Sequence, residues 1–265
     1  MKDKINWPGR LFLIVIFAIL YLPIFYLIFY SFNSGGKMYH FQGFTLEFYK
    51  ELFQNTRLLI IVLNTLIVAL LSALVSTIIG VMGALAIHQM RKKSKNSVLG
   101  LNNVLIVSPD VIIGASFLIL FTTAGLKLGF YSVLLSHIAF SIPIVVLMVL
   151  PKLGEMSPSL IDAARDLGAS PWGVLSKVTL PFIAPGILAG FFMALTYSLD
   201  DFAVTFFVTG NGFSTLSVEI YSMARQGVSL TINALSAVLF LVTMLVVAAY
   251  YAVAGRKKIR VGGRK

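Results

Sequence analysis

Three aspartates lie in stretches of the chain that are otherwise almost free of charge. Asp110 lies in the apolar segment 96–126, and Asp200 and Asp201 lie side by side in the apolar segment 178–218. A carboxylate near the centre of a bilayer costs at least ~2.5 kcal/mol on insertion scales, so an acid there is by default a candidate functional residue. Carboxylates spaced along a route would lower the barrier for a multiply charged cation. The three aspartates therefore indicate a cation pathway.

Aromatic side chains lie next to two of these acids. Their ring faces could add cation–π contacts to a passing ammonium group. The aromatic candidates are Tyr197, Phe202 and Phe206. No lysine or arginine lies within the apolar spans, which argues against an anionic cargo.

Each acid also has a structural interpretation. Asp110 follows Ser108-Pro109, so it could favour the positive end of a restarted helix. Asp200 and Asp201 could lie in the outer interface or cap a short outer element. Because neighbouring helical residues point about 100° apart, we expect at most one of this pair to face a pathway.

The elements that must position these residues are membrane helices. Of the 265 residues, 58% are hydrophobic and 12% are charged, and the mean hydropathy is +0.92. A soluble domain of this size carries roughly twice as much charge, so one aqueous core is excluded. About 20 apolar residues span the hydrocarbon. We predict an all-α membrane domain over 1–265 with spans at 11–32, 58–89, 97–124, 129–151, 181–208 and 229–254.

The basic residues indicate the orientation of these spans. With alternate loops on opposite sides, 16 of the 21 lysines and arginines fall on the side that holds both termini and 5 on the other. Basic loops stay in the cytoplasm, so we expect both termini to be cytoplasmic and the protein to be a multi-pass component of the cell membrane. His137 lies on a charge-free helix, where we expect a hydrogen bond to a neighbouring helix. Close helix contacts are expected at Gly80, Gly83, Gly114 and Gly190.

The loop 152–180, between the fourth and fifth spans, carries strong helix signals. Ser157-Pro158 is typical of a helix start, and Gly168 is typical of the left-handed residue that ends one. Ser170-Pro171 repeats the start signal, and Leu180-Pro181 would restart the chain as the fifth span. The sequence therefore predicts two short helices with a bend at Gly168. The first presents small apolar residues on one face, which suits a groove on another protein rather than a lipid surface.

The same loop resembles the signature of ATP-binding-cassette (ABC) importer permeases. That signature is an acid followed by two alanines, a glycine four residues later and, after nine residues, Ile or Val, any residue, Leu and Pro. The matching residues are Asp162, Ala163, Ala164, Gly168, Val178, Leu180 and Pro181. The resemblance implies the type I importer permease fold, with a coupling helix that docks on a cytoplasmic ATPase. Many relatives have Glu where this chain has Asp162, which would shorten the acid's reach.

Further segments resemble the second permease subunit of spermidine/putrescine importers. They are Ser108-Pro109-Asp110, Ser136-His137-Ile138, Leu199-Asp200-Asp201, Phe207-Val208-Thr209-Gly210, Ile220-Tyr221-Ser222-Met223, Gly227-Val228-Ser229 and Asn233-Ala234-Leu235. The resemblance implies a polyamine cargo, a homologous sibling permease in a heterodimer, an ATPase dimer and an extracytoplasmic binding protein. ATP and Mg²⁺ would bind the ATPase, and this chain would hold no cofactor.

The residues exclude several other functions. The chain lacks a phosphate-binding Gly-x-x-x-x-Gly-Lys-Ser/Thr loop, a catalytic constellation outside the spans, clustered metal ligands and cysteine. We expect a transport subunit that is not an enzyme and holds no metal. Two alternatives remain open. One is an ABC permease for another cation such as ferric iron, and the other is a proton-coupled secondary transporter in which Asp110 carries the proton.

Overall fold

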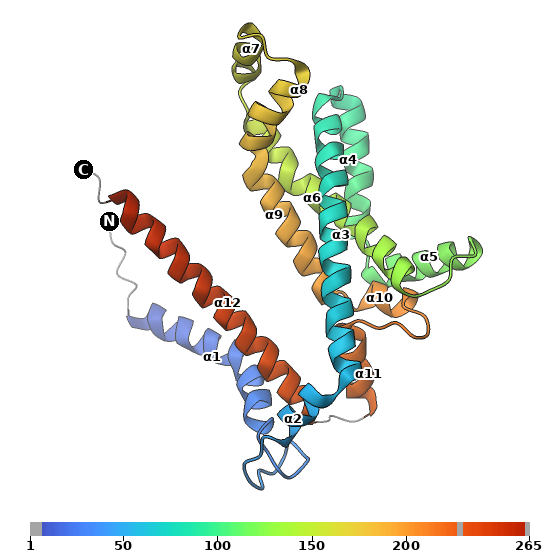
Figure 1. Ribbon diagram of the computed structural model, residues 1–265, viewed down its shortest axis with the longest axis vertical. Coiled ribbons are helices and arrows are strands. Elements are labelled where there is room, and N and C mark those ends of the chain that lie inside the picture. Colours follow the sequence, from blue (N-terminus) through green and yellow to red (C-terminus); the bar gives the residue numbers. More distant parts are fainter. Residues whose placement is uncertain (1–6, 227–229, 263–265) are drawn as a thin grey trace. The chain divides into compact units, whose positions relative to one another are not determined.

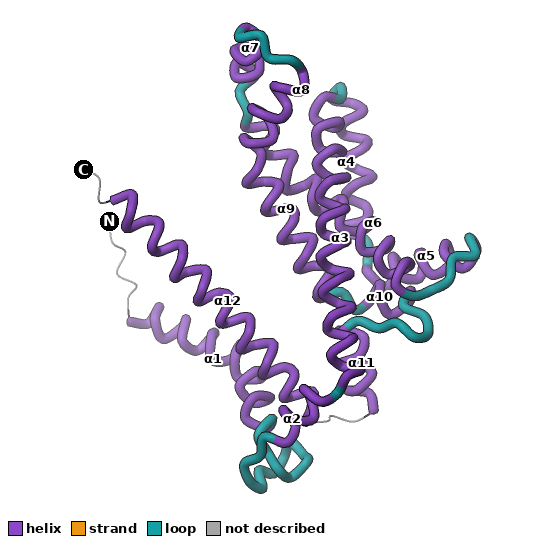
Figure 2. Tube along the Cα trace, in the orientation of Figure 1, coloured by secondary structure: helices purple, strands orange, loops and turns teal. Residues whose placement is uncertain are grey.

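The computed structural model describes residues 7–226 and 230–262, and their regular elements are helices (Figures 1 and 2). Two residues, Asn33 and Phe44, pair in an isolated antiparallel β-bridge. The chain forms two compact units, described separately below. The first comprises residues 1–59 and 220–265, and the second comprises residues 60–219.

The first unit is built on two long helices. α1 (Trp7–Tyr30) is apolar throughout and has no buried residue within this chain, as expected for a helix that faces lipid or another subunit. α12 (Leu230–Gly262) packs against α1 and against the short helix α2 (Glu47–Gln54). Phe240 of α12 makes edge contacts with the rings of Tyr21 and Phe25 of α1.

The second unit has a core of three long helices. These are α3 (Thr56–Gln89), α6 (Phe130–Glu155) and α9 (Leu180–Asp200). Their buried contact is made by aliphatic side chains, most of them alanine or β-branched: Ala73, Val81, Ala84, Val145, Val149, Leu153, Ile183 and Ala194. Glycines allow the close approach. A Cβ atom at Gly80 of α3 would lie 2.7 Å from Val145, and one at Gly190 of α9 would lie 3.2 Å from it.

The predicted third span is not one helix. α4 (Lys92–Val107) and α5 (Asp110–Thr123) meet at a bend of 102°. Pro109 has no amide hydrogen to donate, and it disfavours helical backbone at the residue before it. Ser108 is accordingly extended (φ −68°, ψ 139°). The restart of the helix at Asp110, which the Ser108-Pro109 pair predicts, is confirmed, and a single span over 97–124 stays a prediction.

The predicted fifth span differs at both ends. Its helix ends at Asp200, and α10 (Ala203–Val208) follows as a separate short helix. At the other end the chain does not restart at Leu180. Instead, α8 (Pro171–Val174) continues through a π-helical turn, η1 (Leu175–Thr179), into α9. Pro181 accounts for this widened turn, because in a regular α-helix its ring would clash with the carbonyl one turn earlier.

Within the described part of the chain, four helices are long and apolar enough to cross a membrane, and the bent α4–α5 pair adds a fifth if it is one span. The four are α1, α3, α6 and the continuous stretch Pro171–Asp200. α12 has a shorter described apolar stretch, Leu230–Leu245, and residue 229 of its predicted span lies outside the described residues. The all-α membrane fold is confirmed, and the count of six spans stays a prediction.

The two ends of the second unit differ in what they carry. α7 (Pro158–Asp166) and α8 lie at the same end as the turn between α3 and α4 (Figure 1). α5 and α10 lie at the other end (Figure 1). There the first residue of α11 (Leu216–Gln226) is held to α3, because the amide of Leu216 donates to Thr65 Oγ1 at 2.8 Å.

Candidate functional site

α7 begins where the sequence predicts. Ser157 has the extended backbone of an N-cap, and Pro158 occupies the first helical position. The Ser157 hydroxyl does not cap the helix, however, and instead lies 2.7 Å from the hydroxyl of Ser159. The fixed φ of Pro158, which suits the first turn of a helix, is therefore the stronger local signal for the start of α7.

Gly168 ends α7 in a Schellman motif. Its φ is +82°, in the left-handed region that side chains disfavour. Its amide donates to the carbonyl of Arg165 at 2.8 Å, and the amide of Ala169 donates to the carbonyl of Ala164 at 3.0 Å. These are the two hydrogen bonds that define the motif. The predicted bend between two short helices at Gly168 is confirmed.

α7 and α8 expose apolar side chains at the end of the second unit. Leu167 is 89% exposed and Trp172 is 71% exposed, and Asp162 and Ala163 are also exposed. Large exposed apolar side chains on a short, well-ordered bend are typical of a surface that contacts another protein. This surface contains most of the predicted ATPase-coupling residues. Leu180 and Pro181 lie instead at the start of α9, on the far side of the π-helical turn.

A cavity of about 600 Å³ lies behind α7 and α8. Its walls come from the ends of α3 and α6, from α7 and from the segment 171–179. The lining residues are Leu85, His88, Gln89, Leu153, Met156, Ile161, Arg165, Pro171, Val174, Leu175 and Thr179. The short helices are thus not packed solidly against the spans along their whole length.

Asp110 and Tyr197 form the first pair of predicted pathway residues. Asp110 is the first residue of α5, as its structural interpretation anticipated, and Tyr197 lies in α9. The Tyr197 hydroxyl donates to Asp110 Oδ1 at 2.8 Å. Phe140 of α6 packs edge-on against the Tyr197 ring, with ring centres 4.9 Å apart. Both members of the pair remain partly exposed.

Asp200 and Asp201 face different surroundings. Asp200 is exposed, whereas Asp201 is buried at 9% exposure. Asp201 caps α10: its carboxylate accepts hydrogen bonds from the amides of Val204 at 3.3 Å and Thr205 at 2.8 Å. Its Oδ2 also lies 3.4 Å from Nε2 of His137. The structure therefore places the Asp201 carboxylate inside the protein, in the capping role that its structural interpretation proposed, and away from the exposed surface.

Phe202 and Phe206 belong to the short segment around α10. Their ring centres lie 5.5 Å apart. Phe206 is 47% exposed, and Phe202 is half-buried. These rings follow the exposed Asp200 closely in sequence, and an exposed ring face is where an ammonium group could make cation–π contacts.

His137 joins residues that the sequence does not place together. Its Nδ1 lies 2.6 Å from the Ser198 hydroxyl of α9, and its Nε2 lies 2.8 Å from the Thr205 hydroxyl of α10. The expected hydrogen bond to a neighbouring helix is confirmed. The link to Asp201 was missed, because the rest of α6 and all of α7, α8 and α9 separate the two residues in sequence. The only available signal was a lone histidine on a charge-free helix.

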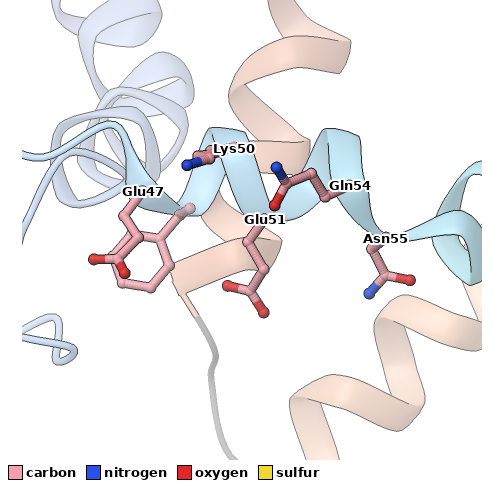
Figure 3. Close-up of a pocket in the computed structure, with 6 residues that line it drawn as sticks. Glu47, Lys50, Glu51, Gln54 and Asn55 are labelled. Atoms are coloured by element: carbon pink, nitrogen blue, oxygen red, sulfur yellow. The ribbon is translucent and has the colours of Figure 1, made fainter.

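The first unit contains a second cavity, of about 700 Å³, on one side of α2 (Figure 3). It is lined by Glu47, Phe48, Lys50, Glu51, Gln54 and Asn55. Glu51 is held by Thr231 of α12, whose hydroxyl donates to its carboxylate at 3.0 Å. Within the residues that the structure describes, no group of three or more potential metal ligands is found.

Comparison with known proteins places this architecture in a class of membrane transport component. Residues 76–259 match the family described as "Binding-protein-dependent transport system inner membrane component", and the chain belongs to that family. A bacterial ABC transporter that imports alginate has a chain of the same fold, with a TM-score of 0.73 and 21% identity over 97% of this chain and 96% of the other. The MetNI methionine ABC transporter gives a TM-score of 0.59 over 80% of this chain.

Among curated proteins the chain is similar to polyamine permeases. It is 40% identical to the spermidine/putrescine transport system permease protein PotC of Escherichia coli K12 over 253 residues, which cover 94% of this chain and 96% of PotC. The Shigella flexneri PotC is 39% identical over 259 residues, 96% of this chain and 98% of that one. The putrescine permease PotI of E. coli K12 is 32% identical over 96% of this chain and 94% of PotI. The chain is a multi-pass transport subunit of the ABC importer type and not an enzyme.

Proposed function

We propose that this chain is one permease subunit of an ATP-driven importer for spermidine or putrescine. The observation that carries this proposal is the 40% identity to PotC over nearly the whole of both chains. The geometry adds support, because Asp200 is exposed and Asp110 is partly exposed and hydrogen-bonded to Tyr197. A polyamine is an aliphatic chain that carries several ammonium groups. Carboxylates and aromatic ring faces are partners that attract such groups.

Asp110, Asp200, Tyr197, Phe202 and Phe206 are the proposed pathway residues. A homologous sibling permease would supply the opposite wall, so that the two permeases form a heterodimer around the path. Asp201, which the sequence analysis grouped with these residues, would support the path from behind rather than line it.

The coupling surface supports dependence on a cytoplasmic ATPase. We assign Asp162, Ala163, Ala164 and Gly168 to the bend that docks on an ATPase dimer, and Leu180 and Pro181 to the segment that transmits its movement to α9. ATP and Mg²⁺ would bind the ATPase, and this chain would hold no cofactor. An extracytoplasmic binding protein would deliver the polyamine on the opposite side.

The orientation follows from charge. The coupling bend shares its end of the second unit with the basic segment 91–95 (Figure 1). Lysine- and arginine-rich loops remain in the cytoplasm. Both features support a cytoplasmic location for that end. For both termini the support is the charge count along the sequence, with 16 of the 21 lysines and arginines on their side of the cell membrane.

The test is uptake of labelled spermidine by the complete transporter in proteoliposomes with ATP inside or outside. ATP-dependent uptake, competed by putrescine and not by ferric iron, is the expected result. Uptake that runs on a proton gradient without ATP would favour the secondary transporter instead. Uptake of ferric iron with no uptake of spermidine would favour a different cation importer.

A further inference from the structure

The direction of the hydrogen bond between His137 and Thr205 follows from the number of hydrogens that Thr205 can donate. Thr205 has one hydroxyl hydrogen, which it donates to Asp201 Oδ2 at 2.7 Å. The Thr205 oxygen, 2.8 Å from His137 Nε2, must then accept, so Nε2 carries a hydrogen. The same Nε2–H lies 3.4 Å from Asp201 Oδ2. His137 is thus a donor toward the segment that joins α9 and α10.

The other ring nitrogen ties this network to α9 and α3. Nδ1 contacts the Ser198 hydroxyl, which in turn receives a hydrogen bond from the Ser72 hydroxyl of α3 at 3.0 Å. The side chains of this hydrogen-bond network are at most 9% exposed. They are Ser72, Ser198, His137, Thr205 and Asp201. Ser198, His137 and Asp201 are the residue types of a hydrolytic triad, but the two ring nitrogens are exchanged: Ser198 contacts Nδ1 and Asp201 lies near Nε2, and all three side chains are buried. The network therefore has a structural role, and its serine does not act as a nucleophile.

The network fixes the first turn of α10. Asp201 accepts hydrogen bonds from the amides of Val204 and Thr205, two of the first three residues of that helix. A buried carboxylate is stable only when hydrogen bonds and charge compensate the loss of water. His137 supplies an ionisable partner, with Nε2 at 3.4 Å from Asp201 Oδ2. Without it, the Asp201 carboxylate would be drawn toward water and would pull the start of α10 with it.

α10 in turn supports α5 by backbone contact. A Cβ atom on Gly114 of α5 would lie 3.1 Å from the Cα atom of Val204 and 3.2 Å from the carbonyl oxygen of Ala203. Gly114 is four residues, or about one helical turn, after Asp110. A shift of the first turn of α10 therefore reaches Asp110 through α5. The same shift reaches Asp200 directly, because it immediately precedes Asp201.

We propose that His137 is a positioning residue for the transport path: from inside α6 it fixes the α9–α10 junction, and so sets the positions of both accessible carboxylates, Asp200 and Asp110. The inference rests on the proposed function for the role of those carboxylates. The fixing of the junction itself is a separate, structural claim and can be tested without any transport.

The structural test uses the absence of cysteine in this chain. A single cysteine at Phe206, on the exposed side of α10, reports the position of the junction through its rate of reaction with a cationic methanethiosulfonate reagent. A cysteine at Tyr39, 74% exposed and in the other unit, is the matched control. The measurement is made on the complete transporter, with labelling scored on this chain alone.

Two amide substitutions separate the two sides of the ring. His137→Gln places a donor near the Nε2 position and is expected to keep the Phe206→Cys rate within about twofold of the parent. His137→Asn reaches only the Ser198 side, and it is expected to change that rate about tenfold without changing the Tyr39→Cys rate. His137→Asn should also raise the KM for spermidine uptake above that of the parent, whereas His137→Gln should leave the KM near the parent value.

Several results would overturn the proposal. Equal Phe206→Cys rates in both variants, or a normal rate in His137→Asn with an abnormal one in His137→Gln, contradict the fixing of the junction. An altered rate with an unaltered KM contradicts the link to the carboxylates. A parent transporter that takes up no polyamine contradicts the proposed function alone, because the labelling comparison still reads the junction.

Discussion

Tyr197 and Asp110, 87 residues apart in sequence, are joined by a 2.8 Å hydrogen bond between α9 and the first residue of α5. The bond lies at the bend between α4 and α5, on the α5 side. It holds a carboxylate in place at the start of a helix that Pro109 has separated from α4. The tyrosine ring also offers its face beside the acid, so one residue both orients the carboxylate and provides a surface for a cation.

Substitution of this pair should affect transport in a graded way. Asp110→Asn removes the charge but keeps a hydrogen-bond acceptor for Tyr197, and it should reduce spermidine uptake about tenfold or more, because a cation in a low-dielectric path loses its counter-charge. Tyr197→Phe keeps the ring and frees the carboxylate, and it should have a smaller effect, about two- to fivefold. The measurement is initial uptake rate in proteoliposomes. Equal loss in both variants would show that the hydrogen bond, and not the charge, matters.

Asp200 and Asp201 should behave differently although they are adjacent. Asp200→Asn should reduce polyamine uptake and leave thermal unfolding of the purified chain unchanged, because its side chain is exposed. Asp201→Ala removes the cap of α10 and a buried partner of His137, and it should lower stability by about 2 kcal/mol or more. Unfolding followed by fluorescence in detergent distinguishes the two. A destabilised Asp200→Asn with a normal Asp201→Ala would reverse the assignment.

Gly168 should be needed for docking of the ATPase. Gly168→Val forces a β-branched residue to a φ of +82°, at a cost of about 1–3 kcal/mol, and should undo the Schellman bend. We expect loss of ATPase association and of ATP-dependent uptake, measured by co-purification and by transport. Gly173→Ala is the control. The backbone of Gly173 is not in the left-handed region, and an added Cβ atom would lie 3.4 Å from Ser170 Oγ, which is an ordinary contact distance. Undisturbed association in Gly168→Val would rule out the docking role.

The contact between Gly80 and Val145 should show compensation. Gly80→Ala places a Cβ atom 2.7 Å from Val145 and should destabilise the second unit by about 1–3 kcal/mol. Val145→Ala in the same chain makes room and should recover most of that loss. Gly100→Ala, where nothing lies within 4 Å, should be neutral. The readout is the unfolding temperature in detergent. Additive losses in the Gly80→Ala/Val145→Ala pair would mean that the two helices do not meet at these residues.

The amino-acid sequence by itself determined what depends on composition and on local backbone preference. The excess of apolar residues requires a membrane protein, and Pro158 and Gly168 fix the ends of α7 because proline and glycine constrain their own backbone wherever they occur. The signature of the proposed coupling segment was readable for the same reason, since all its residues lie within the short stretch 162–181.

Only the tertiary structure decided which side chains meet. Asp200 and Asp201 are indistinguishable by type and by apolar surroundings, yet one is exposed and the other is buried beside His137, because the helix ends between them and α10 turns away. The 102° bend at Pro109 was likewise not predictable, since a proline in an apolar segment can either kink a span or break it. Contacts between residues 61 to 126 positions apart, such as those of Ser198 with His137 and Ser72, arise from helix packing, which no local pattern encodes.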